Sequence, residues 1–330
     1  MGQVIVVGSV NTDYAIRVAS LPRPGETVTG GRLQILPGGK GANQAHAAAR
    51  LGAAVVLVAA VGADPAADSA RADLAAEGID TSCLVRCEGP SGVAMILVDA
   101  AGENMIAVAP GANDHLTAAT VTGLLDGRVD AGSVILVSLE VPLAAVTAAA
   151  TAATAAGAIL VINPAPGQIL PPGVVRGAIL TPNEGEVLRL APPAEAGDTT
   201  GGDTESADTA GAGTTGGDTA DERGAVAYLM RAGARAVIVT RGSRGATLFR
   251  DGRQRVDLPA PRVEVVDTVG AGDAFNGALV TGLAAALPLE TAVAAAVAAG
   301  AAACTGPGAR QALPRAGDIA LLEKAPTADG

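Results

Sequence analysis

A small-residue turn near residue 270 could place a carboxylate beside a phosphate. Segment 269–273 reads Val-Gly-Ala-Gly-Asp, after the β-branched run 263–267 and before an Ala- and Leu-rich stretch. We expect a strand that ends at Asp267, a tight turn, and a helix that begins near Asp273. Free N–H groups and the positive end of a helix dipole together bind anions, so residues 270–273 form a candidate anion hole.

The Asp273 carboxylate is a candidate base that accepts a hydroxyl proton as a phosphate moves. An isolated Asp after a Gly-rich turn is more often a helix N-cap, and that alternative stays open. The helix dipole also favours the charged carboxylate, which predicts a weakened base. Such weakening is tolerable in phosphoryl transfer, which depends chiefly on positioning and charge neutralisation.

A second Gly-rich segment, residues 37–44, reads Pro-Gly-Gly-Lys-Gly-Ala-Asn-Gln and opens a helical stretch to Leu51. Its bare backbone, with polar Asn43, suits close approach by a polyhydroxyl ligand. It is no Walker A loop, because Lys40 precedes Gly41 instead of Ser or Thr, and Gln44 replaces the third Gly of a dinucleotide fingerprint. Lys40 is one of only two Lys residues in the chain. A purely structural turn is the alternative.

Polar residues follow two predicted strands. Asn11 and Asp13 come after Val4–Val7, and Glu140 comes after Val134–Val137. Ligands of parallel α/β sheets bind at the carboxyl ends of the strands, and Asp and Asn side chains can pair with vicinal hydroxyls. We expect a hydroxyl-binding set here; a simple turn at 11–13 and a helix entry at Glu140 are the alternatives.

Strands and helices alternate along most of the chain, which predicts an α/β fold with a mostly parallel central sheet and helices on both faces. The predicted strands are Val4–Val7, Val55–Ala60, Val134–Val137, Leu160–Ile162, Ile179–Leu180 and Ala236–Thr240. The predicted helices are Asn43–Leu51, Pro65–Glu77, Pro142–Ala156 and Gly224–Ala232.

Two regions, at about 13–36 and 92–109, break this alternation and predict a small separate sheet over the site. The first holds Tyr14–Val18 and Thr27–Ile35, and the second is a hairpin of Val93–Val98 and Asn104–Val108. A cover of this kind would exclude water from the reaction. Residues 193–221 are rich in Gly, Thr and Asp and predict a disordered insertion, and we expect a loose tail at 323–330 after a domain of residues 1–322.

Composition excludes several classes of function. A net charge of −11 without a basic stripe argues against nucleic acid as a partner. The longest apolar stretch, about 14 residues, is too short to cross a bilayer, and no secretory signal is evident, so we expect a cytoplasmic protein. Cys83, Cys87 and Cys304 lack metal-ligand spacing and predict packed, reduced thiols. Two Phe, two Tyr and no Trp leave little aromatic stacking for a base or sugar.

Together the motifs at 38–43 and 267–277 resemble the two signatures of the ribokinase family of carbohydrate kinases, and the resemblance runs from about Val4 to Leu322. The segments 163–166, 181–186 and 240–245 also match the family. The resemblance implies a three-layer αβα fold with a small β-sheet lid. It also implies ATP-dependent phosphorylation of D-ribose at its 5-hydroxyl, with Mg²⁺ or another divalent cation and, as an activator, K⁺.

The resemblance assigns roles by position. Asp273 would be the base, and the sugar would be held by Asn11, Thr12, Asp13, Gly39, Lys40, Gly41, Ala42, Asn43, Glu140 and Asp273. ATP would contact Asn183, Thr240, Arg241, Gly242, Ser243, Arg244, Gly245, Gly270, Ala271, Gly272 and Asp273. Glu186 would organise Mg²⁺ through water, unless it is only a solvated helix residue.

The implied K⁺ site uses Asp267 and the carbonyls of Val269, Ala303, Gly306 and Gly308. This sequence departs from the family there, because Ala312 stands where a hydroxyl often contributes and Gly306 and Pro307 replace bulkier residues. The resemblance also implies a homodimer formed through the lid.

Alternatives on the same fold are a kinase of deoxyribose, fructose or a nucleoside. A non-catalytic sugar-binding protein would have lost Asp273 or its glycines, which are present. A nicotinamide dehydrogenase lacks support because its fingerprint and a proton-relay His are missing.

Overall fold

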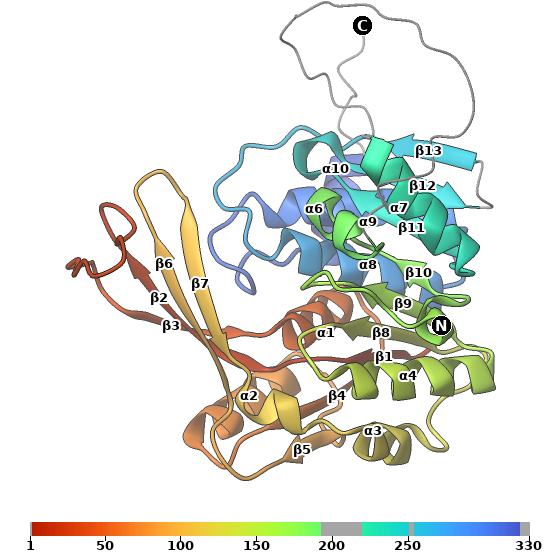
Figure 1. Cartoon of the computed structure of the whole chain (residues 1–330), viewed down its shortest axis with the longest axis horizontal. Helices are drawn as coiled ribbons and strands as arrows, with labels where there is room; N and C mark the ends of the chain where they lie inside the picture. Colours follow the sequence, from red (N-terminus) through yellow and green to blue (C-terminus); the bar gives the residue numbers. More distant parts are fainter. Residues whose placement is uncertain (1, 193–219, 251–253, 324–330) are drawn as a thin grey trace, which may run out of the picture.

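The computed structural model describes residues 2–192, 220–250 and 254–323 (Figure 1). The predicted insertion at 193–221 and the predicted tail at 323–330 therefore lie almost entirely outside the described residues. Within the described ranges, no helix is both long and apolar enough to cross a membrane.

A nine-stranded sheet forms the centre of the fold, in the order β13-β12-β11-β10-β9-β8-β1-β4-β5. The six predicted strands are all present, and the pairs from β11 to β5 are parallel, whereas β12 and β13 are antiparallel to their neighbours. The strands are β1 Val4–Val7, β4 Val55–Val61, β5 Leu84–Arg86, β8 Val134–Ser138, β9 Ile159–Asn163, β10 Ile179–Leu180, β11 Ala236–Thr240, β12 Ala246–Arg250 and β13 Gln254–Leu258.

Helices cover both faces of the sheet, because successive strand residues point to opposite sides. Val4 and Val6 of β1 pack into one apolar cluster, while Ile5 and Val7 pack into the other. The first face carries α1 Lys40–Arg50, α2 Pro65–Ala76, α8 Ala271–Ala284, α9 Leu289–Ala303 and α10 Ala316–Glu323. The second carries α3 Ala118–Leu125, α4 Leu143–Ala156, α5 Pro172–Val175, α6 Glu184–Arg189 and α7 Ala220–Arg231. This is the predicted three-layer arrangement.

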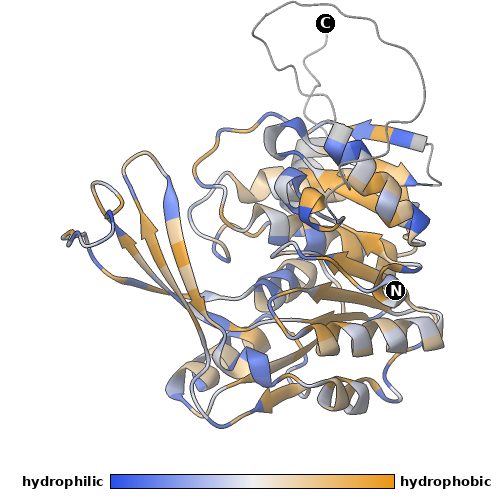
Figure 2. Ribbon diagram, in the orientation of Figure 1, coloured by the Kyte–Doolittle hydropathy of each residue, from blue (hydrophilic) through white to orange (hydrophobic). Residues whose placement is uncertain are grey.

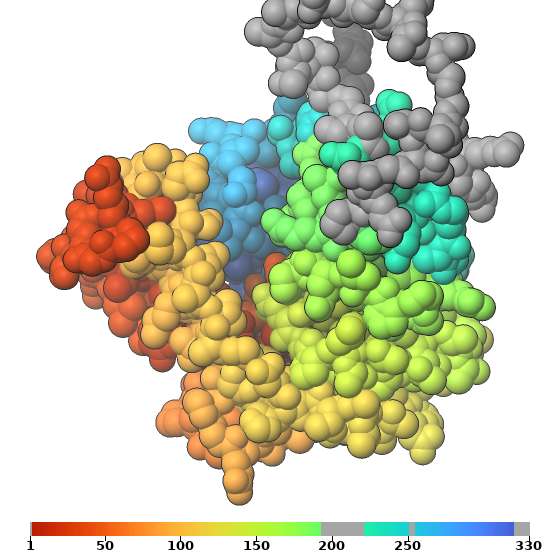
Figure 3. All heavy atoms as spheres, viewed as in Figure 1, coloured from red at the N-terminus to blue at the C-terminus, as the bar shows by residue number. Residues whose placement is uncertain are grey.

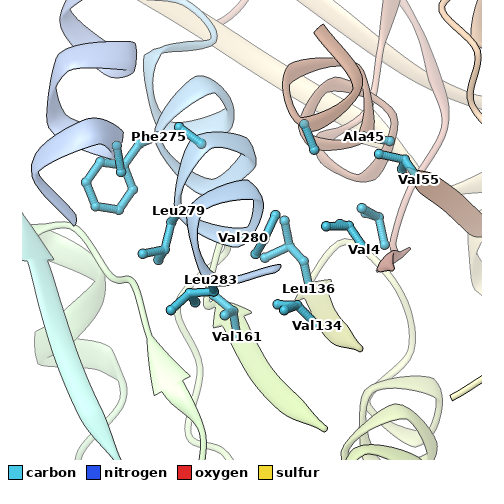
Figure 4. Packing of buried hydrophobic residues seen from close by; sticks show 14 of the residues in the cluster. Val4, Ala45, Val55, Val134, Leu136, Val161, Phe275, Leu279, Val280 and Leu283 are labelled. Atoms are coloured by element: carbon cyan, nitrogen blue, oxygen red, sulfur yellow. The ribbon is translucent and has the colours of Figure 1, made fainter. Parts of the chain in front are cut away.

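Aliphatic side chains make the core between α8 and the sheet (Figure 4). Leu279, Val280 and Leu283 of α8 face Leu136 and Val161 of the central strands, and all five are buried. Ala side chains on α1 and α9 let these helices pack closely against α8. The first turn of α8 is thereby fixed at the edge where the parallel strands end.

The predicted lid is a separate four-stranded sheet in the order β3-β2-β6-β7, which projects from the main body (Figure 1). Its strands are β2 Asn11–Arg17, β3 Gln34–Gly38, β6 Gly92–Val98 and β7 Asn104–Ala109. Residues 27–33 were predicted to be extended, but the strand begins only at Gln34. Strand β3 runs directly into α1, which begins at Lys40, three residues earlier than predicted.

The predicted strand at Val263–Asp267 is wrong. The segment has irregular backbone, and Val265 and Val266 are 59% and 60% exposed. Its N–H groups at Val266 and Asp267 donate to the carbonyl of Cys304, at the end of α9, instead of to a strand. A β-branched run predicts a strand only where a sheet edge is available to pair with it.

Candidate active site

Asp273 lies in the first turn of α8 but does not cap it. The N-cap residue is Gly270, whose φ of 84° is the left-handed conformation that favours glycine. A Cβ at Gly270 would also lie 2.9 Å from the Cα of Ala309. The N-cap alternative for Asp273 is therefore wrong, and its carboxylate is free for another role.

Two amide side chains of α1 hold the Asp273 carboxylate. Asn43 Nδ2 donates to Oδ2 at 3.0 Å, and Gln44 Nε2 donates to Oδ1 at 3.1 Å. The Gln44 amide also donates to Asn163 Oδ1 at 3.0 Å, which ties α1 to the end of β9. Gln44 Oε1 is buried and has no hydrogen-bond partner in the described residues. Both Asp273 oxygens thus accept hydrogen bonds from fixed donors.

Burial raises the pKa of Asp273 above its ordinary value, although Lys40 and the two amides lower it. The sequence predicted a base weakened by the helix dipole, but loss of solvent acts in the opposite direction and outweighs the other effects. Burial alone would lower the pKa of Lys40, yet the carboxylates of Asp273 and Glu140 raise it above its ordinary value. Lys40 therefore stays a cation among acidic groups.

The predicted anion hole has the donors that it needs. The N–H groups of Gly270, Gly272 and Asp273 donate to no group in the described part of the chain. A Cβ placed on Gly272 would meet nothing within 4 Å, so the backbone there borders open space. Free donors at a helix N-terminus beside open space suit a phosphoryl group.

Asp13 stands on β2 with a carboxylate that accepts no hydrogen bond from the described residues. A Cβ on Gly38 would lie within 2.3 Å of the Asp13 carboxylate oxygens, so a larger residue there would displace this carboxylate. Burial raises the pKa of Asp13 to about 6, helped by the nearby Glu140 and Asp273 charges and opposed by Arg310 and Lys40. A half-buried carboxylate without a protein donor is free to accept hydrogen bonds from the hydroxyl groups of a ligand.

The remaining sugar-site candidates lie around the same point. Glu140 Oε2 accepts from the backbone N–H of Lys40 at 3.0 Å and from Ser9 Oγ at 2.5 Å, so it supports the start of α1. The Asn11 side chain accepts from Asn113 Nδ2 at 2.8 Å. Residues Thr12 of β2 and Gly39, Gly41 and Ala42 at the β3–α1 junction complete this set. A Cβ added at Gly41 would lie 2.5 Å from the backbone of Gly8. At Gly41 the close approach is therefore made by another segment of the chain, whereas the sequence predicted the approach of a ligand.

Three residues in this cluster were missed. Arg310 is buried and bonds Asn43, Gly38 and Asp73, while Gln44 and Asn113 hold site side chains. Gln44 belonged to a motif already noted, and its neighbour Asn43 was the available signal. No pattern around Arg310 or Asn113 distinguishes them from surface residues in a sequence.

The ATP-site candidates gather at a second place along the same sheet edge. Asn183 forms an isolated parallel bridge with Thr240, so the start of α6 adjoins the loop after β11. Glu184 pairs with Arg241 at 2.9 Å and with Arg244 at 2.5 Å. The loop residues Gly242, Ser243 and Arg244 are exposed, and Gly245 is buried with a φ of 87°. Arg241 is buried against Glu222, so its side chain supports the loop.

Glu186 and Asn183 form the capping box of α6. Asn183 Oδ1 accepts from the Glu186 N–H at 2.8 Å, and the Asn183 N–H donates to Glu186 Oε2 at 2.9 Å. A capping box accounts for both residue types by helix stability alone. In the described residues, no group of three or more His, Cys, Asp or Glu side chains could hold a metal.

The candidate K⁺ residues meet in one loop system. Asp267 Oδ1 accepts from the Val269 N–H at 3.0 Å and Oδ2 accepts from the Gly308 N–H at 2.9 Å. The carbonyls of Val269, Ala303, Gly306 and Gly308 accept no hydrogen bond from the residues described. Gly306 packs against Ala312, because a Cβ added at Gly306 would lie 3.2 Å from the Cβ of Ala312. Free carbonyls beside one carboxylate are a donor set that a monovalent cation accepts.

Space for substrates lies between the lid and the body. Figure 3 shows a hollow between the lid strands and the main body. The Asn43–Asp273 hydrogen bond joins the two signature motifs within the body. The geometry thus brings the predicted hydroxyl-binding residues, a buried carboxylate and free N–H donors to one sheet edge.

Known proteins are similar to this chain in sequence and in fold. A model of the pfkB family of carbohydrate kinases matches residues 1–316. The ribokinase of Haemophilus influenzae is 36% identical over 326 residues, which cover 97% of this chain and 98% of that protein. The deoxyribokinase of Salmonella typhi is 34% identical over 279 residues, 83% of each chain.

A solved structure agrees with these relatives. The ribokinase of Arabidopsis thaliana, complexed with ribose and ATP, is 26% identical and matches with a TM-score of 0.79 over 98% of this chain and 99% of that one. The resemblance inferred from the two signatures and the ribokinase-like fold are both confirmed. The chain belongs to the pfkB family of carbohydrate kinases.

Proposed function

We propose that this chain transfers the γ-phosphoryl group of ATP to the 5-hydroxyl of D-ribose, giving D-ribose 5-phosphate and ADP. The observation that carries the proposal is the placement of Asp273. It is a buried carboxylate in the first turn of α8, beside free N–H groups, and it accepts a hydrogen bond from Asn43 of the Gly-rich segment 37–44. A relative and a solved structure that are both ribokinases support D-ribose as the sugar.

The proposed reaction is a direct transfer. Asp273 accepts the proton of the 5-hydroxyl while its oxygen forms a bond to the γ-phosphorus and the bond to the β,γ-bridging oxygen breaks. The N–H groups of Gly270, Gly272 and Asp273 donate to the transferring phosphoryl oxygens. The raised pKa of Asp273 makes it a better proton acceptor than an exposed Asp.

The other hydroxyls of ribose would bind on the lid side of the site. Asp13 offers a carboxylate without a partner, and Asn11, Asn43 and Lys40 offer hydrogen-bond donors. Asn183 and the 240–245 loop would contact ATP, because they flank α6 at the next position along the sheet edge. We infer that residues 1–322 act as one catalytic unit, since Asn43 and Asp273 come from opposite ends of the chain.

The proposed metal ions fit the residues present. Without an all-protein cage among the described residues, Mg²⁺ would be held mainly by ATP phosphates and water, as is usual for this ion, with Glu186 as an outer partner. K⁺ would bind Asp267 and the free carbonyls around it. When bound, these cations supply charge neutralisation next to the anion hole.

The lid supports a homodimer. Strand register places Ile35, Tyr14 and Met95 in one row on the face opposite Asp13, and Met105 lies in the next row of that face. Ile35 and Met95 are 60% and 56% exposed. Figure 2 shows apolar colour on these strands. An exposed apolar sheet face of this kind is typical of an interface.

We also infer a cytoplasmic location, since the reaction needs ATP.

The test is turnover of D-ribose, 2-deoxyribose, fructose and adenosine with Mg-ATP, in K⁺ and in Na⁺. We expect D-ribose to give the highest kcat/KM, with a phosphomonoester at O5 as product. Faster turnover of 2-deoxyribose, which the Salmonella relative makes the main rival, would overturn the sugar assignment. Equal rates in K⁺ and Na⁺ would remove the K⁺ site.

The role of Asp273 has a matched pair of variants. Asp273→Asn keeps the shape but cannot accept the proton, so kcat should fall roughly 10²- to 10⁴-fold. Asp68→Asn, at a side chain that is 71% exposed, should leave kcat unchanged. Sugar binding without turnover in the wild-type protein would favour a non-catalytic binding protein.

A further inference from the structure

We propose that Arg310 is a positioning residue of the sugar site, which fixes the orientation of the Asn43 amide and so keeps Asp273 bonded as a hydrogen-bond acceptor. This inference rests on the proposed function. Arg310 follows the candidate K⁺ loop and comes from the far end of the chain, 267 residues from Asn43.

The guanidinium of Arg310 is buried and donates in three directions. Nε donates to Asn43 Oδ1 at 2.8 Å, Nη2 donates to the Gly38 carbonyl at 2.8 Å, and Nη1 donates to Asp73 Oδ2 at 2.5 Å. These acceptors belong to α1, to the last residue of β3 and to α2. One side chain therefore connects α1 with the lid strand β3 and with α2.

The contact with Asn43 determines which way its amide faces. A guanidinium has only donors, so the atom it contacts must be the amide oxygen. The Asn43 NH₂ group then points at Asp273 Oδ2, 3.0 Å away, and donates to it. If the amide turned over, its oxygen would face the carboxylate and the hydrogen bond would become a repulsion. Arg310 therefore acts on the base through Asn43.

The contact with Gly38 lies next to a second carboxylate, that of the half-buried Asp13. Gly38 lies directly beneath Asp13, where an added Cβ would come within 2.3 Å of the carboxylate oxygens. Holding the Gly38 carbonyl fixes the backbone next to the Asp13 carboxylate. The Arg310 charge also offsets the neighbouring acidic groups, because it opposes the rise in the pKa of Asp13.

Only Arg suits this place, because three acceptors in different directions match a rigid planar fork. Lys would keep the charge but could not maintain all three contacts. The third contact, with Asp73, serves to anchor α2. Asp73 accepts from no site residue other than Arg310 in the described residues, and His46 Nε2 lies 3.3 Å from it. Asp73 is therefore a control for the purely structural role.

The test is a double-mutant cycle of Arg310→Met and Asn43→Ala, read as kcat and KM for D-ribose and for ATP. Arg310→Met should lower kcat/KM for ribose about 10- to 100-fold, since it leaves the buried Asn43 oxygen unpaired, and should leave KM for ATP within about twofold. In the Asn43→Ala background the same change should cost at least about threefold less than in the wild type, because only the effect through Gly38 remains. A full, multiplicative loss in that background would overturn the proposal.

Asp73→Asn separates positioning from anchoring. It should lower Tm yet leave kcat/KM for ribose within about twofold, whereas a loss equal to that of Arg310→Met would show that Arg310 acts only through α2. If Arg310→Met does not fold, Arg310→Lys takes its place in the cycle, with an expected loss of about tenfold. Absence of pentose turnover in the wild type would refute the proposed function instead, so the two failures are distinct.

Discussion

The Nδ2 atom of Asn43 lies 3.0 Å from Oδ2 of Asp273, across 230 positions of sequence. This hydrogen bond joins α1 to α8, whose backbones approach closely at Gly277, where an added Cβ would lie 2.8 Å from the backbone N of Ala48. A Cβ on Gly277 would lie 2.4 Å from the Cβ of Ala47. The distance between the candidate base and its amide donors is therefore set by contact between the two helix backbones.

Gly277→Ala should push α1 away from α8 and weaken the Asn43–Asp273 contact. We expect kcat to fall at least about tenfold and the free energy of unfolding to drop by about 1–3 kcal/mol, as overpacking typically costs. Urea unfolding and steady-state kinetics measure both. Gly123→Ala on α3 is the matched control, because a Cβ there meets nothing within 4 Å. Equal behaviour of the two variants would contradict this role for the helix contact.

Gly272→Ala should separate folding from catalysis. The added methyl group meets no protein atom within 4 Å, and Ala suits a helix better than Gly, so Tm should stay the same or rise. The methyl would, however, occupy space at the proposed anion hole and lower kcat/KM for ATP at least about tenfold. Gly224→Ala on α7, also open to space, should raise or preserve Tm without affecting kinetics. Unimpaired kinetics in Gly272→Ala would argue against the anion hole.

The charged form of Asp13, a proposed substrate ligand, should lower the free energy of unfolding. Its pKa in the folded protein is about 6, above the ordinary value of 3.8, so the folded state binds more protons between these values. Stability therefore falls as pH rises from about 4 to 6 and then stays low. Asp13→Asn should stabilise the protein at pH 8 by about 1–3 kcal/mol, since one pKa unit corresponds to ~1.4 kcal/mol.

The gain should shrink toward zero at pH 3, where Asp13 is largely protonated in both states. Urea unfolding of wild type and variant at both pH values measures it. A gain that does not change with pH would contradict the electrostatic explanation. KM for ribose should rise strongly in Asp13→Asn at pH 8, and in the wild type it should rise as pH falls below about 6, because the neutral acid is a weaker acceptor.

Met95→Glu should disrupt the proposed dimer. The side chain lies on the outer face of the lid and is 56% exposed, so a charge there would be buried against the partner at a high cost. Sedimentation should show a dimer for the wild type and a monomer for the variant. Leu287→Glu, at an exposed apolar residue between α8 and α9, should remain a dimer. A monomeric wild type would refute the lid interface.

Local patterns predicted the elements well wherever burial is regular. Strands β1, β10 and β11 have the predicted bounds, because their residues are buried on both faces and read as continuous apolar runs. The run Val263–Asp267 failed for the opposite reason, since its valines find no sheet edge and stay exposed. Strand propensity alone does not supply a partner.

The candidate site was predictable to the extent that its residues lie in motifs. Asn43 and Asp273 stand in Gly-rich turns that call for an explanation, and the structure brings them together. Arg310 stands in a loop without periodicity, and its importance arises only from three contacts with distant segments. The raised pKa of Asp273 depends on burial, which no spacing of residues reveals.

The separate lid sheet has a consequence for how this enzyme could acquire new substrates. The proposed base and its amide donors are positioned by close contact between α1 and α8, where Gly277 leaves no room for an added atom. Asp13 and Asn11, in contrast, sit on β2 of the lid, whose edge strand β7 is exposed along its whole length. Substitutions on the lid can accumulate without disturbing the reacting groups. Sugar preference is therefore the evolvable trait of this architecture, whereas its chemistry is conserved by packing.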